Sequence, residues 1–153
     1  MRKRSKYRPK ISVQNPVALA ISKVTPLTKA VDDNAILRTA ARLAYTLLKT
    51  GKAGRQEIAD LCDYSNCGQS LKEAGKGTDY AAELLAGADA LEAVIKRKRE
   101  HGTYICTAPQ LSAIAVMLDV VDAQLDASTV YEVIAARAVT QRVLKNLEPL
   151  EVV

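Results

Sequence analysis

The sequence of 153 residues contains neither phenylalanine nor tryptophan, and its large aromatic residues are six tyrosines. Any hydrophobic core must therefore consist mainly of aliphatic side chains. Hydrophobic residues make up 48% of the chain, which is enough for one core of ordinary domain size. Alanine and leucine, which are abundant here, favour helix, and small side chains let helices approach closely. The composition predicts a mainly α-helical fold.

The sequence also lacks a run of about 18 or more uncharged apolar residues, so we expect no membrane-spanning helix. The first ten residues are basic, but the apolar stretch that follows them in a signal peptide is interrupted by Gln14, Asn15, Pro16 and Lys23. We therefore expect a cytoplasmic protein.

Histidine occurs once and cysteine three times. An odd number of cysteines without an export signal favours reduced thiols over disulfides. Cys62, Cys67, His101 and Cys106 have the chemistry of a zinc site, but each pair is separated by four residues and has no glycine knuckle. We therefore predict no metal ion and no cofactor.

Carboxylates at helical spacing, Asp119, Asp122 and Asp126, suggest the solvated face of an amphipathic helix more than an acid–base cluster. The chain has no recognisable nucleophile–base arrangement and no glycine-rich phosphate loop. We expect a binding protein and not an enzyme.

Positive charge is concentrated at the start of the chain. Residues 1–10 contain six basic residues and no acidic residue, whereas residues 11–153 contain 16 basic and 17 acidic residues. Pro9, Pro16 and Pro26 prevent a long helix in this region. We predict an extended basic arm and strap over residues 1–31, followed by a single helical domain over residues 32–153.

The domain is expected to be a compact bundle of four to six helices. A first helix should follow the capping residues at 32–34 and end at Gly51, because apolar residues recur between them at three- and four-residue steps. The pattern of residues 55–74 predicts one bent helix or two short helices. A third helix should begin at Thr78 or Asp79 and end in a basic turn before Gly102.

Residues 103–106 form a short β-prone link, after which Thr107 and Pro109 are typical of a helix start. Thr129 and Glu132 have the spacing of a capping box, so residues 108–147 are either two helices or one long helix. The inward positions of these helices predict a set of core leucines: Leu43, Leu47, Leu84, Leu91, Leu118 and Leu125.

The segment from Arg55 to Ser65 resembles the first helix and turn of a helix-turn-helix motif. Asp63 replaces the turn glycine, and Gly68 would weaken the recognition helix. An amphipathic helix with a polar turn is therefore the preferred interpretation, and a DNA-binding regulator remains an alternative.

Two basic clusters are candidate partner-binding residues. Salt-dependent contact with RNA or DNA phosphates would use the arm together with a run at the end of the third expected helix. Tyr7 in the arm would stack on a nucleobase or anchor the arm in a protein groove. The complete set is Arg2, Lys3, Arg4, Lys6, Tyr7, Arg8, Lys10, Lys96, Arg97, Lys98 and Arg99.

Short motifs scattered over the chain resemble small uncharacterised proteins encoded by phages and prophages of Gram-negative bacteria. They are Arg2–Lys10, Thr25–Pro26, Gly87–Leu91, Gly102–Tyr104 and Asp122–Asp126 with Thr129–Val130. The resemblance implies an accessory protein, in the bacterial host cell, that binds and inhibits a host nucleic-acid-handling defence complex, as anti-CRISPR proteins do. The partner would be a host protein or ribonucleoprotein. A virion structural or assembly protein is a further alternative.

Overall fold

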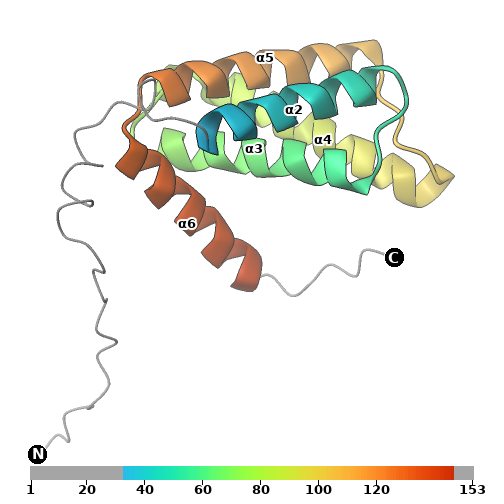
Figure 1. The fold of residues 1–153 in the computed structure, drawn as a ribbon. Helices are drawn as coiled ribbons and strands as arrows, with labels where there is room; N and C mark the ends of the chain where they lie inside the picture. The colour runs from blue at the N-terminus through green and yellow to red at the C-terminus, as the bar shows by residue number, and fades with distance from the viewer. Residues whose placement is uncertain (1–32, 147–153) are drawn as a thin grey trace, which may run out of the picture.

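The computed structural model describes residues 33–146. The arm predicted for residues 1–31, including its seven candidate partner-binding residues, lies outside the described residues, and so does Leu147, the predicted end of the last helix. The described part contains five α-helices and one 3-10 helix and no strand (Figure 1): α2 Asp33–Lys49, α3 Arg55–Glu73, η2 Thr78–Tyr80, α4 Ala81–His101, α5 Ala108–Asp126 and α6 Val130–Asn146. None of these helices is long and apolar enough to cross a membrane.

Helices α2, α3, α4 and α5 lie along one bundle, and consecutive helices run in opposite directions (Figure 1). Helix α3 is central, because it contacts α2, α4, α5 and α6. Helix α6 packs against α3 and leaves the bundle at an angle (Figure 1). The prediction of a mainly α bundle with four to six helices is confirmed.

The predicted helix ends are mostly confirmed. Gly51 follows α2 and Gly102 ends α4, both with positive φ, the left-handed backbone conformation that glycine adopts most readily. Thr107 caps α5 by accepting a hydrogen bond from the Gln110 amide. The start of α4 differs from the prediction, because Thr78 and Asp79 belong to a separate 3-10 turn and the helix begins at Ala81.

The capping box between Thr129 and Glu132 also forms. The Glu132 amide donates to the Thr129 hydroxyl at 3.4 Å, and the Thr129 amide donates to the Glu132 carboxylate at 2.8 Å. Each of these two bonds gives an acceptor to a backbone N–H group that has none within the helix. Residues 108–146 are therefore two helices, α5 and α6.

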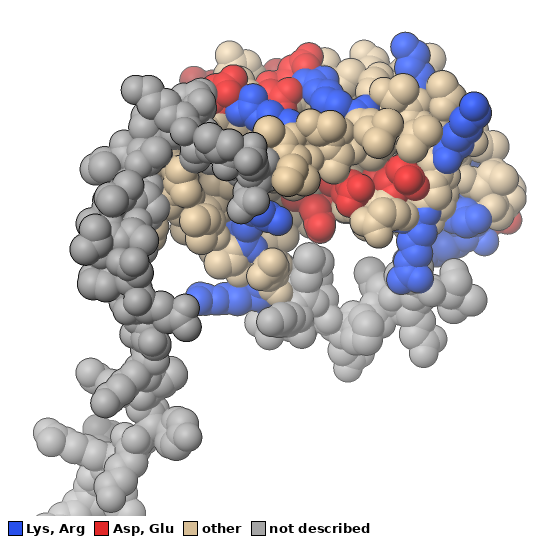
Figure 2. Space-filling view, viewed as in Figure 1, with Lys and Arg blue, Asp and Glu red and all other residues tan. Residues whose placement is uncertain are grey.

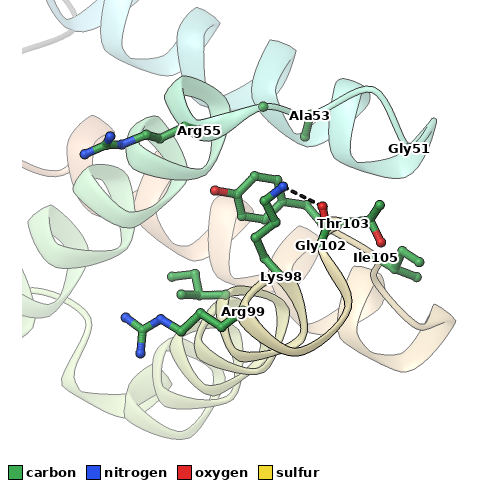
Figure 3. Close-up of a pocket in the computed structure, with 11 residues that line it drawn as sticks. Gly51, Ala53, Arg55, Lys98, Arg99, Gly102, Thr103 and Ile105 are labelled. Carbon is green, nitrogen blue, oxygen red and sulfur yellow. Dashed lines mark hydrogen bonds between the residues drawn. The ribbon is translucent and has the colours of Figure 1, made fainter. Parts of the chain in front are cut away.

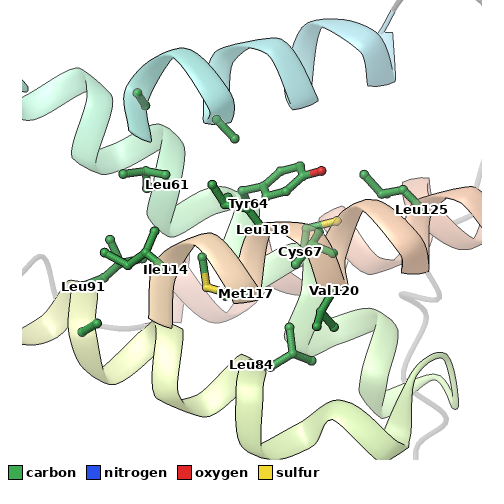
Figure 4. Packing of buried hydrophobic residues seen from close by; sticks show 14 of the residues in the cluster. Leu61, Tyr64, Cys67, Leu84, Leu91, Ile114, Met117, Leu118, Val120 and Leu125 are labelled. Atoms are coloured by element: carbon green, nitrogen blue, oxygen red, sulfur yellow. The ribbon is translucent and has the colours of Figure 1, made fainter. Parts of the chain in front are cut away.

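Four of the six predicted core leucines are buried: Leu84, Leu91, Leu118 and Leu125. They pack with residues of α3, among them Leu61 and the ring of Tyr64 (Figure 4). Tyr64 has no exposed surface although it carries a hydroxyl.

The prediction for α2 is wrong at Leu43, whose exposed fraction is 57%, and Leu47 is only half-buried. Helix α2 is apolar on two faces, and the fully buried residues of the face that packs inward are two alanines and one leucine: Ala41, Ala44 and Leu48. The opposite face includes Leu43 and Ile36, which is 63% exposed. Leucines at helical spacing could not indicate which of two apolar stripes turns toward α3.

Helices α4 and α5 approach closely at Gly87. A Cβ atom added to Gly87 would overlap the Cβ of Met117, which is next to the α5 backbone. A Cβ on Gly68 of α3 would lie 2.5 Å from Val121. The two glycines therefore set how near α5 lies to its neighbours.

Candidate nucleic-acid interface

Basic residues gather at one end of a bundle whose charges otherwise balance. Residues 33–146 contain 14 basic and 14 acidic residues. The segments 49–57 and 96–105, at the end where α2 and α4 stop and α3 begins, contain only two acidic residues, Glu57 and Glu100. Figure 2 shows Lys and Arg concentrated at this end, on the right of the view. We call the basic residues of these segments the basic end: Lys49, Lys52, Arg55, Lys96, Arg97, Lys98 and Arg99.

Five residues of the basic end are exposed to solvent and have no acidic partner within ion-pair distance among residues 35–142, whose side chains the structure describes. They are Lys49, Lys52, Arg55, Lys96 and Arg99. The ion pairs of the described chain lie mainly elsewhere, on α2, α5 and α6. Within the described part of the chain, these five cations repel one another and no carboxylate offsets their charge by an ion pair.

The other two cations of the basic end hold the loop between α4 and α5. Arg97 donates to the Ile105 carbonyl oxygen and, at 3.1 Å, to the Gln110 side chain. Lys98 donates to the Gly102 carbonyl oxygen at 2.5 Å, and its Nζ lies 5.2 Å from the centroid of the Tyr104 ring. The run 96–99, predicted as one binding cluster, is therefore divided between solvent-facing and structural roles.

A cavity of about 650 Å³ opens between the α2–α3 loop and the α4–α5 loop (Figure 3). Cations and apolar groups both line it: Gly51, Ala53, Gly54, Arg55, Ile95, Lys98, Arg99, Gly102, Thr103, Tyr104 and Ile105. A second groove, of about 590 Å³, lies between α3 and α4 and shares Ile95 and Arg99 with the first. The two hollows are therefore contiguous at the basic end.

The cysteines do not form a candidate active site. Burial raises the pKa of Cys62 and of Cys67 to about 11, and the Asp63 carboxylate contributes at Cys62. Few thiolates would form at neutral pH, so these groups are weak nucleophiles. Among residues 33–146 no group of three or more His, Cys, Asp and Glu side chains is placed to hold a metal ion.

The three aspartates of α5 were interpreted as a solvated face, and the side chains of Asp119 and Asp126 are indeed 71% and 55% exposed, but all three carboxylates also form ion pairs. Arg42 of α2 binds Asp119 at 2.7 Å and Asp122 at 2.5 Å, and Arg38 binds Asp126 at 2.5 Å. The carboxylates face α2 because that helix presents two arginines one turn apart. They join two helices.

No protein-family model, curated protein or solved structure matches this chain.

The course of α3 excludes the helix-turn-helix interpretation of residues 55–75. Helix α3 is continuous from Arg55 to Glu73, so Asp63 lies within a helix and not in a turn. Ser65, which would have to cap the second helix of such a motif, is only 4% exposed and lies within α3. The buried position of Gly68 also explains why a glycine interrupts the helical pattern, since a Cβ there would meet Val121.

Sequence reasoning missed Lys49, Lys52 and Arg55 as candidate binding residues. The two lysines lie at the end of the first expected helix, where cations are common because they interact favourably with the helix dipole. More than 40 residues separate them from Lys96 and Arg99, and only the antiparallel course of the helices brings the two groups to one end. The signal available in the sequence was that the first and the third expected helices both end in basic residues.

Proposed function

We propose that this protein is a non-enzymatic accessory protein of a phage or other mobile element, which binds and inhibits a host nucleic-acid-handling defence complex in the manner of an anti-CRISPR. Its basic end contacts the phosphates of the nucleic acid in that complex. The observation that supports this proposal is the group of five exposed cations that have no acidic partner among the described residues, on a bundle of balanced charge.

Phosphate is the anion that suits this surface best. Arg55 and Arg99 can each donate two parallel hydrogen bonds to a phosphate, and Lys49, Lys52 and Lys96 add point charges. Each phosphate that is neutralised releases counterions, which provides affinity without sequence recognition. The six basic residues among residues 1–10 add charge of the same sign.

Binding to labelled single-stranded RNA, single-stranded DNA and duplex DNA tests the proposal, with fluorescence anisotropy measured at several salt concentrations between about 50 and 200 mM. Replacing two cations, Arg55→Gln with Arg99→Gln, should weaken binding and reduce the slope of log K against log salt by about 0.7 per lost phosphate contact for a single strand. Failure to bind any of these nucleic acids at the lowest salt would contradict the proposal.

The matched control is Lys72→Gln with Arg142→Gln, which removes the same charge from α3 and α6 outside the basic end. This control should keep most of the affinity. Equal losses in the two double variants would mean that net charge, and not the basic end, determines binding.

The host partner is tested by capture from lysate of the natural host. The unaltered chain should recover a nucleic-acid-processing complex and inhibit its activity, and the Arg55→Gln/Arg99→Gln variant should do both less well. Recovery of that complex in equal amounts by both proteins would show that the basic end does not contribute to partner binding.

A further inference from the structure

The cavity at the basic end combines features that a phosphate contact alone does not need. Its volume of about 650 Å³ lies within the range of small-molecule sites. Arg55 of α3 and Arg99 of α4 line it, and both side chains extend to the same side in the view of Figure 3. Tyr104 and Ile95 supply apolar surface in the same space. A ligand that fills it would have both an anionic part and a flat apolar part.

The Tyr104 ring is held in place before any ligand binds. Lys98 lies over the ring and is itself fixed by its bond to the Gly102 carbonyl oxygen, and Arg97 binds the carbonyl oxygen of Ile105. The backbone is thus tied to α4 two residues before the tyrosine and one residue after it. A ring that is already ordered loses little conformational entropy on stacking.

We infer that this cavity holds an unpaired nucleobase of a single-stranded nucleic acid, with the base against the part of the Tyr104 ring that Lys98 does not cover and the adjoining phosphates on Arg55 and Arg99. The inference rests on the proposed function and specifies the form of nucleic acid that is bound. Within a duplex the bases are stacked and paired, so a concave site reaches them only at the cost of unpairing. Single strands present their base faces to aromatic side chains freely.

A single-stranded RNA that contains one 2-aminopurine tests the inference, because the emission of this base changes when it stacks. Titration with the full chain should change the emission, and single strands should bind more tightly than duplex of the same length. Tyr104→Leu should abolish the change and lower single-strand affinity about 5- to 100-fold, as for loss of one stacked base. Its salt dependence should be unaltered, since no cation is removed.

Tyr104→Phe keeps the ring and should bind nearly as tightly as the unaltered chain. Tyr80→Leu is the matched control, because Tyr80 is 53% exposed and precedes the start of α4, whereas the cavity lies at its other end. Melting temperatures of all variants should be compared to show that each one folds.

Three outcomes would overturn the inference. Equal affinity for single strands and duplex, unchanged by Tyr104→Leu but lowered by Arg55→Gln/Arg99→Gln, would leave the proposed function intact and remove the base site. Equal weakening by Tyr104→Leu and Tyr104→Phe would exclude stacking. Absence of all nucleic-acid binding would remove both proposals.

Discussion

The buried hydroxyl of Tyr64 in α3 donates a hydrogen bond to the carboxylate of Asp122 in α5. The other oxygen of that carboxylate accepts a hydrogen bond from Arg42 of α2 at 2.5 Å, so one aspartate joins three helices. Burial raises the pKa of Tyr64, because it disfavours the phenolate, and the bond to Asp122 raises it further. The tyrosine is therefore a neutral donor at physiological pH.

Removing this hydroxyl with Tyr64→Phe should lower the free energy of unfolding by about 1 kcal/mol. The expected loss is modest because Asp122 is partly exposed and keeps its bond to Arg42. Urea denaturation measures the change, and Tyr80→Phe, at an exposed tyrosine, is the control. An unchanged midpoint in Tyr64→Phe would show that the bond contributes no net stability.

Two leucines that the sequence pattern treats alike should respond differently to truncation. Leu118→Ala removes a side chain with no exposed surface and should cost about 2 to 5 kcal/mol. Leu43→Ala removes one that is 57% exposed and should cost less than about 1 kcal/mol. Thermal or urea unfolding of both variants checks this, and similar losses would mean that α2 packs with its other face inward.

Gly87→Ala should destabilise the protein although alanine favours helix over glycine by about 1 kcal/mol. The new Cβ would overlap Met117 near the backbone of α5, so the helices must move apart, and overpacking of this kind costs about 1 to 3 kcal/mol. The melting temperature measures the net effect. A higher melting temperature would contradict the close contact of α4 with α5.

Acid should weaken the start of α6. The backbone amide of Thr129 holds the pKa of Glu132 below its ordinary value of 4.5, and Lys76 contributes to the same shift. A carboxylate whose pKa is lower in the folded state stabilises the fold above the unfolded pKa, and this stabilisation is lost as the pH falls through the folded pKa.

Glu132→Gln should therefore lower the melting temperature at neutral pH, and the difference from the unaltered chain should shrink as the pH is lowered below 4.5. Circular dichroism at several pH values measures it. Glu73→Gln, at an exposed carboxylate near the end of α3, is the control. A difference that stays constant with pH would mean that the charge of Glu132 plays no part.

Local signals in the sequence were sufficient for the helices and most of their ends. The capping of α5 by Thr107 and of α6 by Thr129 depends on residues three positions apart, and Gly102 ends α4 through its own backbone conformation. Such interactions need no distant partner, so spacing predicts them. The same reasoning predicted burial of Leu84 and Leu118, which lie on clear apolar stripes.

The tertiary structure decided which face of each helix turns inward and which helices pack together. The ion pairs of Arg38 and Arg42 with the aspartates of α5 link residues about 80 positions apart, and no local pattern specifies that pairing. Lys52 and Arg55 likewise come near Arg99 only through the packing of distant segments. The amino-acid sequence alone determined where helices form, because capping and apolar periodicity act over a few residues, whereas the surface available to a partner depended on packing between distant segments.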